Sequence, residues 1–283
     1  MKRVLITGSN GQLGSELKYL SSNFENIEFV FANAKRLDVT SKEGLTLFFE
    51  ANQFDYCINC AAYTAVDKAE EEKEHAELIN ATAAKYLAEI TKINRVKYIH
   101  ISTDFVFSGD RNTPYTEIDN PRPINYYGAS KLRGEQLAIS ANKDSVVIRT
   151  SWLYSSFGNN FVKTMLRLAE SKNELGIVCD QIGTPTYARD LANAILKIIM
   201  TDNYQSGVYH YSNEGVASWY DFAQAIFEEK ELIIKLKPIR TEQYPTPAQR
   251  PPYSVMSKAK INNTFKIKIP HWRESLRIYL AYI

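Results

Sequence analysis

Runs of consecutive apolar residues divide the first half of the chain at regular intervals. They occupy residues 3–8, 27–32, 55–62, 96–103 and 145–153, as in RVLITG and IEFVFA. Apolar runs of this length, with few alternating polar positions, are typical of strands that are buried on both faces of a parallel sheet. The pattern therefore predicts a series of buried parallel strands in the first 150 residues.

Between these runs, apolar residues recur at intervals of three and four, which predicts amphipathic helices. These helices cover residues 11–22, 41–52, 74–92 and 126–140. Strands that alternate with helices, joined by right-handed crossovers, form a doubly wound sheet with helices on both faces. We therefore expect an α/β fold, with a doubly wound parallel sheet of the Rossmann type that binds a dinucleotide, in residues 1–150.

The alternation is less regular after residue 150. Helices are predicted at 159–171 and 188–200, a strand and loop at 175–183, and a short strand at 207–213. From about residue 230, prolines interrupt the pattern, as in YPTPAQRPPYS, which predicts irregular structure before a short final helix. We expect residues 151–283 to hold a smaller C-terminal substrate-binding domain, chiefly 151–174 and 229–283, while about 175–228 adds strands and helices to the first domain.

Composition and charge narrow the class of partner. The 283 residues include 34 lysines and arginines and 32 aspartates and glutamates, for a formal net charge of +2. This balance argues against nucleic acid or an anionic membrane as the main partner. The first apolar run is too short for a secretory or transmembrane segment, so a cytoplasmic protein is expected.

Cysteine and histidine spacing does not favour redox or zinc chemistry. Three cysteines cannot form a disulfide framework. Cys57 and Cys60 have the spacing of a redox pair, but a strand would point them to opposite faces, so we interpret them as buried small hydrophobic residues. The four histidines are far apart in the sequence and form no HExxH pair, which argues against a zinc site.

The stretch TGSNGQLG follows the first predicted strand and opens a helix. Gly8, Gly11 and Gly14 allow a tight turn and let backbone amides approach a pyrophosphate at the helix N-terminus. This context favours dinucleotide binding over the alternative of a purely structural turn.

The second predicted strand ends at Asn33, where a dinucleotide-binding fold often has an acid that holds the adenosine ribose. Lys35 and Arg36 follow. Without a carboxylate at this point, a ribose phosphate would meet no repulsion, and a nearby cation could pair with it. NADPH is therefore favoured over NADH, although both cations could simply be exposed loop residues.

Thr103, Tyr127 and Lys131 form a candidate catalytic trio. Thr103 ends a strand at the edge of the sheet where ligands bind, and Tyr127 and Lys131 share one helix face about 6 Å apart. A tyrosine acting as an acid near neutral pH needs its pKa to fall by about 3, of which one close cation supplies about 1 to 3. We expect Lys131, helped by a cationic oxidised nicotinamide, to lower the pKa of Tyr127.

These residues resemble the extended short-chain dehydrogenase/reductase superfamily and, within it, the dTDP-4-dehydrorhamnose reductase family. The matching stretches are TGSNGQLG, LDVT, NCAAYTAVDKAE, STDFVFSG, YYGASKLRGE, RTSWLYS, NNFVKTMLRLA, DQIGTPTYARDLA and YPTPAQRP. The resemblance implies NAD(P)H-dependent reduction of the 4-keto group of a dTDP-linked sugar, with Tyr127 as the proton donor. It also implies a nucleotide-sugar partner and is compatible with a homodimer.

The resemblance assigns residues to cofactor and substrate. Expected cofactor contacts are Gly8, Asn10, Gly11, Gln12, Leu13, Asn33, Asp38, Val39, Ala62, Tyr63, Thr64, Tyr127 and Lys131. Expected substrate contacts are Thr103, Asp104, Tyr127, Trp152 and Arg250, with Arg250 meeting the phosphates. Some relatives bind magnesium between subunits through acids. Glu16 matches one such position, but Arg189 lies near another, so we predict no required metal.

The alternatives are another nucleotide-sugar 4-ketoreductase, a nucleotide-sugar epimerase and a dinucleotide-binding regulatory subunit. A nucleotide-sugar dehydratase is disfavoured: it carries a glutamate base directly after the aspartate of the strand end, and this chain has Phe105 there, so elimination lacks its base. An epimerase uses the same catalytic trio, and differs in retaining its cofactor. A regulatory subunit would bind a dinucleotide and a partner enzyme without turnover, and would not need the intact trio.

Overall fold

The computed structural model describes residues 1–201 and 203–283. Its centre is a six-stranded sheet in the order β10-β5-β4-β3-β1-β2, with every neighbouring pair parallel. The strands are β1 (Lys2–Thr7), β2 (Ile27–Ala32), β3 (Tyr56–Asn59), β4 (Lys97–Thr103), β5 (Val146–Thr150) and β10 (Gly207–His210). The expected doubly wound parallel sheet is confirmed. Its strand order reverses between β1 and β3, where such folds bind ligands.

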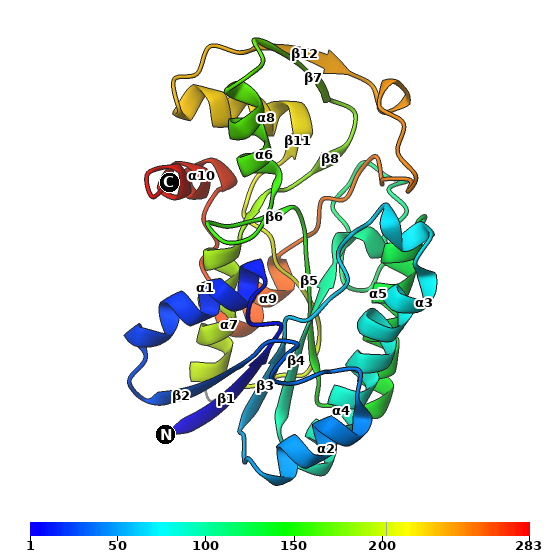
Figure 1. Cartoon of the computed structure of the whole chain (residues 1–283), viewed down its shortest axis with the longest axis vertical. Coiled ribbons are helices and arrows are strands. Elements are labelled where there is room, and N and C mark those ends of the chain that lie inside the picture. The colour runs from blue at the N-terminus through cyan, green and yellow to red at the C-terminus, as the bar shows by residue number, and fades with distance from the viewer. Residues whose placement is uncertain (202) are drawn as a thin grey trace.

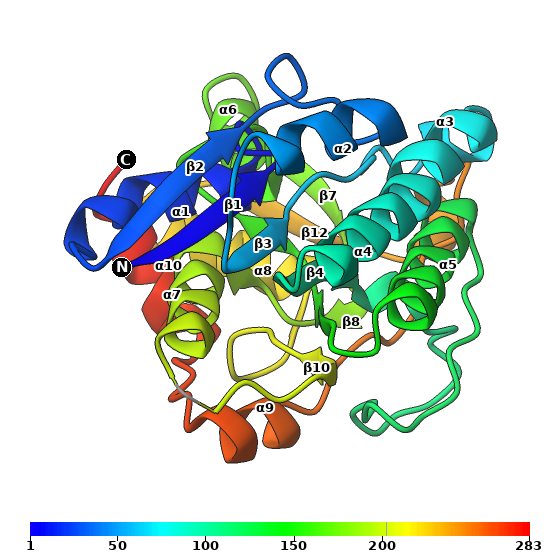
Figure 2. The ribbon, with the colours of Figure 1, turned by 90° about the horizontal axis from the view of Figure 1, so that it is seen from below.

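Helices cover both faces of the sheet, as Figure 2 shows. One face packs against α1 (Gln12–Leu20), α7 (Ala188–Met200) and α9 (Ala259–Phe265). The other packs against α2 (Lys42–Glu50), α4 (Ala83–Ile93) and α5 (Tyr126–Ala141). Because both faces are buried, the strands are apolar at consecutive positions, as the sequence pattern predicted.

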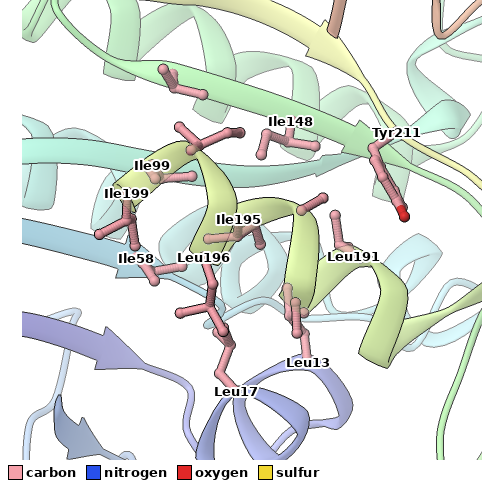
Figure 3. Close-up of a cluster of buried hydrophobic side chains, with 14 of the residues drawn as sticks. Leu13, Leu17, Ile58, Ile99, Ile148, Leu191, Ile195, Leu196, Ile199 and Tyr211 are labelled. Carbon is pink, nitrogen blue, oxygen red and sulfur yellow. The ribbon is translucent and has the colours of Figure 1, made fainter. Parts of the chain in front are cut away.

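Alternate side chains of each strand enter different cores. Figure 3 shows the core on the α1 and α7 face, where Ile58, Ile99 and Ile148 of the sheet meet leucines and isoleucines from the two helices. Cys57 and Tyr98 point to the opposite face, toward α2 and α4. Full burial of one such aliphatic side chain contributes about 1.5–3 kcal/mol, so these two cores stabilise the sheet and its helices together.

A second lobe lies beyond the carboxyl ends of the strands, at the top of Figure 1. It contains α6 (Phe161–Ala169), α8 (Trp219–Glu229), α10 (Trp272–Leu280) and the parallel pair β7 (Glu174–Val178) and β12 (Lys235–Ile239). Two short strand pairs lie in the segments that connect the lobes. They are β6 (Leu153–Tyr154) with β9 (Thr186–Tyr187), and β8 (Ile182–Gly183) with β11 (Ala217–Ser218). Buried aromatic and aliphatic residues of α6, α8 and α10 form its core.

Packing divides the chain differently from the expected bounds in two places. β7 and α8 lie in the stretch of about 175–228, to within one residue, but pack in the second lobe, whereas α9, in the C-terminal tail, packs on the sheet. Neither α8 nor β12 was predicted. A capping box marks the start of α8: the Ser218 side chain accepts a hydrogen bond from the Asp221 N–H, and the Asp221 side chain accepts one from the Ser218 N–H. The division into a dinucleotide-binding and a substrate-binding part stays a proposal.

The long helix predicted at 74–92 is interrupted. It consists of α3 (Lys73–Glu77), a π-helical turn at Leu78–Thr82, and α4. At this turn the backbone approaches α5 closely, since a Cβ added at Gly134 would lie 2.0 Å from the Asn80 carbonyl oxygen. Across the described residues, the helices are all too short or too polar to cross a membrane.

Candidate active site

A cleft of about 1200 Å³ lies between the carboxyl ends of the strands and the second lobe. Most of the residues expected from the sequence line it. They are Gly11, Gln12, Leu13, Ala62, Thr64, Thr103, Asp104, Tyr127, Lys131, Trp152 and Arg250. The tertiary structure therefore brings together residues from six separate parts of the chain.

The other expected residues do not line this cleft. They are Gly8, Asn10, Asn33, Asp38, Val39 and Tyr63. Gly8 lies in the turn that directly follows β1. Asn33, Asp38 and Val39 lie in the segment that follows β2. Tyr63 turns its hydroxyl to Glu72, to which it donates a 2.8 Å hydrogen bond.

The glycine turn after β1 has the shape of a phosphate cradle. Gly8 has φ +62°, and a Cβ there would lie 2.5 Å from the Ala61 backbone nitrogen. A Cβ at Gly14 would lie 2.6 Å from the Gly8 carbonyl oxygen. Helix α1 begins after Gly11 without a side-chain cap, so its first amide groups are available to a ligand. These features fit the pyrophosphate of a dinucleotide.

The end of β2 forms a tight turn without a carboxylate at its first position. The Asn33 side-chain oxygen accepts hydrogen bonds from the backbone N–H groups of Lys35 and Arg36, both at 3.1 Å. The Arg36 guanidinium donates to the Phe31 carbonyl oxygen at 2.9 Å, while Lys35 is exposed. Of Asn33, Lys35 and Arg36, Lys35 therefore has the charged side chain that takes no part in the turn.

Thr103 and Tyr127 meet because the start of α5 is pressed against the end of β4. Asn125 caps α5 by accepting a 2.7 Å hydrogen bond from the Gly128 N–H, and a Cβ at Gly128 would lie 2.1 Å from the Phe105 carbonyl oxygen. The Phe105 ring packs edge-on against Tyr127, with 5.8 Å between centroids. Thr103 and Tyr127 both line the cleft, and the Thr103 hydroxyl donates a 3.1 Å hydrogen bond to the Asp104 side-chain oxygen.

The protein's own groups leave Tyr127 protonated, and the expectation that Lys131 lowers the pKa of Tyr127 with the help of an oxidised nicotinamide stays a prediction. Burial raises the pKa of Tyr127 to about 12, and only the Thr103 hydroxyl opposes that rise. Desolvation of a phenolate outweighs a cation that is itself hydrogen-bonded elsewhere. At neutral pH Tyr127 therefore keeps its proton, which is the form that a proton donor needs.

Lys131 is anchored in the floor of the cleft. It is buried, and its ammonium donates a 2.6 Å hydrogen bond to the Ile101 carbonyl oxygen. Burial lowers the pKa of Lys131 to about 8, and Glu135, one helical turn further on, partly opposes this. Lys131 and Tyr127 lie on one face of α5, as their spacing predicted.

A buried network that sequence reasoning missed lies behind Lys131. Glu135 accepts hydrogen bonds from Arg149 at 2.7 and 2.9 Å and from the Ser102 hydroxyl at 2.5 Å. The i+4 spacing of Glu135 from Lys131 was the available signal, because it continues the same helix face. The network ties α5 to β4 and β5, the two strands that end at the cleft.

Asp104 faces the cleft next to Thr103. The residue is 2% exposed, and its Oδ2 makes no hydrogen bond within the described residues. Burial raises the pKa of Asp104 to about 6. A carboxyl group with a free oxygen can bind a ligand hydroxyl, which fits the expected place of Asp104 among the substrate contacts.

Two further expected contacts are held by partners. Trp152 lies flat against Trp219, with ring centroids 3.6 Å apart. Arg250 forms a bidentate ion pair with Asp67, at 2.6 and 2.7 Å. Because Asp67 occupies both terminal nitrogens of Arg250, a phosphate would have to share or replace this carboxylate. Trp219 and Gln181 also line the cleft and were not predicted.

The cysteines and acids singled out from the sequence have structural surroundings. Burial raises the pKa of Cys60 to about 12, which makes its thiolate scarce and agrees with the non-redox interpretation. Glu16 is buried and accepts hydrogen bonds from Arg189 at 2.9 Å and Ser155 at 2.7 Å. In the residues described, no cluster of three metal-ligating side chains occurs, and the expectation of no required metal stays a prediction.

Comparison with known proteins assigns the full length of the chain to one family. The family model described as the RmlD substrate binding domain matches residues 1–283. SpsK, a spore coat polysaccharide biosynthesis protein of Bacillus subtilis (strain 168), is 45% identical, over 99% of this chain and 97% of its own. The dTDP-4-dehydrorhamnose reductase of Aggregatibacter actinomycetemcomitans is 40% identical, over 100% and 99% respectively.

A solved structure gives the same assignment. The dTDP-4-dehydrorhamnose reductase of Bacillus anthracis str. Ames, in complex with NADP, superposes with a TM-score of 0.95 at 41% identity, covering 100% of this chain and 99% of its own. Fold, cleft and sequence relatives thus agree along the whole chain. This chain belongs to the RmlD substrate binding domain family, that of the dTDP-4-dehydrorhamnose reductases.

Proposed function

We propose that this protein reduces the 4-keto group of dTDP-4-dehydro-L-rhamnose to give dTDP-L-rhamnose, with NADPH as the reductant. The observation that carries the proposal is that Thr103, Tyr127 and Lys131 line the same cleft as the uncapped start of α1. One arrangement thus offers a proton donor for a ketone oxygen and a cradle for a dinucleotide, in a chain whose relatives are named for this reaction.

NADPH is proposed over NADH on two grounds. The Bacillus anthracis relative was solved in complex with NADP. In addition, the turn after β2 offers Asn33 and the exposed Lys35 to a ribose phosphate, where a carboxylate would repel it. Gly11, Gln12 and Leu13 would hold the pyrophosphate at the start of α1, and Ala62 and Thr64 would line the path toward the nicotinamide. When bound, the reduced nicotinamide supplies the hydride.

Tyr127 and Thr103 would act on the ketone oxygen. The Thr103 hydroxyl donates a hydrogen bond that orients the carbonyl, and Tyr127 transfers its proton to the oxygen as the carbon receives the hydride. The products are an alcohol and a phenolate, which regains its proton from solvent. The Lys131 ammonium, fixed behind Tyr127 on the same helix face, favours the phenolate electrostatically.

The remaining expected contacts would bind the nucleotide sugar. Trp152 and Asp104 line the cleft with Thr103 and would offer an indole and a carboxyl group to the sugar. Arg250, which also lines the cleft, would bind the diphosphate in exchange for part of its contact with Asp67. A homodimer and a place in the cytoplasm remain predictions.

The reaction is tested by following NADPH absorbance with dTDP-4-dehydro-L-rhamnose present. Tyr127→Phe should lower kcat by a factor of about 10² to 10⁴, because it removes the proton donor and keeps the ring. Tyr126→Phe is the matched control, since Tyr126 packs near Lys73 and does not line the cleft. Cofactor binding, followed by NADPH fluorescence, should survive in both variants.

Two results would contradict the proposal. Normal turnover by Tyr127→Phe would show that another group donates the proton. A protein that keeps its dinucleotide through purification, and changes the sugar without net oxidation of NADPH, would be an epimerase.

A further inference from the structure

Two tryptophans from different lobes form a single stacked unit in the cleft wall. Trp152 follows β5 of the main sheet, and Trp219 is the first residue of α8 in the second lobe. Their rings are nearly parallel, with an interplanar angle of 6° and 3.6 Å between centroids. Both rings line the cleft, so the stack spans the boundary between the dinucleotide side and the second lobe.

The backbone of Trp152 adopts a conformation that bulky residues rarely take. Its φ is +46°, in the left-handed region. Neighbouring contacts hold it there: the Thr186 N–H donates to the Trp152 carbonyl oxygen at 3.1 Å. Gly183 permits the close packing of the indole, because a Cβ there would lie 2.6 Å from its Cε2 atom. Strain of this kind is retained where it positions a functional side chain.

Trp219 is itself fixed through its edge and its neighbours. Its indole N–H donates to the Gln181 side-chain oxygen at 3.2 Å, and the Gln181 amide donates to the Thr241 hydroxyl at 3.1 Å. The Phe161 ring packs against the Trp219 ring, with 4.7 Å between their centroids. Trp219 therefore presents a fixed plane, and Trp152 lies on that plane.

From these contacts we infer that Trp219 is a positioning residue for substrate specificity: it fixes the Trp152 indole, which lies between Trp219 and Gly183 and meets the sugar at the cleft wall. This inference rests on the proposed function and deepens it. An indole held in a fixed position gives the cleft an apolar wall of fixed shape, while Asp104 and Thr103 offer polar groups to the sugar hydroxyls. Gln181 acts one step further away, by fixing the Trp219 indole.

The stacking itself can be tested without substrate. Two parallel indoles at this distance should give an exciton couplet in the circular dichroism spectrum. Trp219→Phe, Trp219→Leu and Trp152→Phe should each abolish the couplet. Trp272→Phe should keep it, because Trp272 is buried in the second-lobe core and does not line the cleft. A couplet that persists in Trp219→Leu would overturn the proposed geometry.

The functional role is tested by steady-state kinetics. Trp219→Leu should raise KM for the nucleotide sugar by about tenfold, with a smaller fall in kcat and an unchanged Kd for NADPH. Trp219→Phe should recover part of the loss, since it keeps a flat ring, and Gln181→Leu should raise KM by a smaller factor. If Trp219 only supported the fold, the variants would lose thermal stability and kcat together, and KM would not rise in the order Gln181→Leu, then Trp219→Leu.

The outcomes separate this inference from the proposed function. If the wild-type protein reduces the sugar and Trp219→Leu keeps its KM, the inference fails alone. If the wild-type protein does not oxidise NADPH with this substrate, the proposed function fails and takes the inference with it.

Discussion

The ammonium of Lys131 lies 2.6 Å from the carbonyl oxygen of Ile101, near the carboxyl end of β4. The contact joins helix α5 to the strand that carries Thr103, and it is buried from solvent. A lysine in this position is costly to charge, and burial lowers its pKa to about 8. Helix α5 thus keeps a cation in the floor of the cleft at the expense of stability.

Lys131→Met should make the protein more stable at neutral pH while it removes activity. The pKa of Lys131 is depressed on folding, from an ordinary value near 10.5 to about 8, so the charged lysine destabilises the fold below pH 8. The variant should gain up to about 3 kcal/mol in the free energy of unfolding at pH 7, less about 1 kcal/mol for the lost hydrogen bond. Urea unfolding at several pH values measures this gain.

The sign of the pH dependence is the sharper part of that prediction. The gain should shrink as pH rises from 8 to above 10, because the lysine of the unfolded wild-type chain then also loses its proton. A stability difference that stayed constant between pH 7 and 10.5 would show that Lys131 is not charged and desolvated in the fold.

Asp104→Asn should stabilise the protein above pH 6 and leave it unchanged near pH 4. Burial raises the pKa of Asp104 from 3.8 to about 6, so folding favours its protonated form and the wild-type protein loses stability as pH rises from about 4 to about 6. The difference should reach about 3 kcal/mol at pH 8. Because Asp104 also lies in the cleft, the same variant should raise KM for the nucleotide sugar.

Asp119→Asn provides a control of opposite sign. Backbone and side-chain hydrogen bonds from Thr116, with help from Arg111, lower the pKa of Asp119 to about 2. Its variant should therefore lose stability at pH 7, and the loss should fade as pH falls toward 2. If both variants responded to pH in the same direction, the buried state of Asp104 would be in doubt.

Asn33→Asp should shift cofactor preference from NADPH toward NADH. The aspartate can accept the same two backbone hydrogen bonds as Asn33, so the turn after β2 should persist. Its charge would repel a ribose phosphate and bind the free ribose hydroxyls, and we expect a change of about tenfold or more in the ratio of kcat/KM values. Lys35→Ala should weaken NADPH alone. An unchanged ratio in Asn33→Asp would remove the argument from the end of this strand.

Local patterns predicted the sheet because its strands are buried on both faces. The elements predicted at residues 27–32 and 188–200 have the same bounds as β2 and α7. A long apolar run or a regular 3.6-residue period can be recognised in the sequence without knowledge of what the element packs against. The pattern was less informative for α8 and β12, and the capping box at Ser218 was overlooked. The π-helical turn at Leu78–Thr82 had no local signal in the sequence, because it accompanies the close approach of α5, which is a tertiary contact.

The candidate site divides in the same way. Its residue types and spacings, above all Tyr127 with Lys131 and the glycines after β1, were available from the chain, since a helix or a turn brings near neighbours together by itself. The protonation of Tyr127, the pairing of Arg250 with Asp67 and the stack of Trp152 on Trp219 were not. Each depends on burial or on contact between residues far apart in sequence.

By itself, then, the sequence determined the order of strands and helices and the chemistry that a ketone reductase requires. Only the tertiary structure decided which groups are desolvated and which are already paired. A pKa or an aromatic stack depends on everything within a few ångströms, and most of those neighbours come from other elements of the fold.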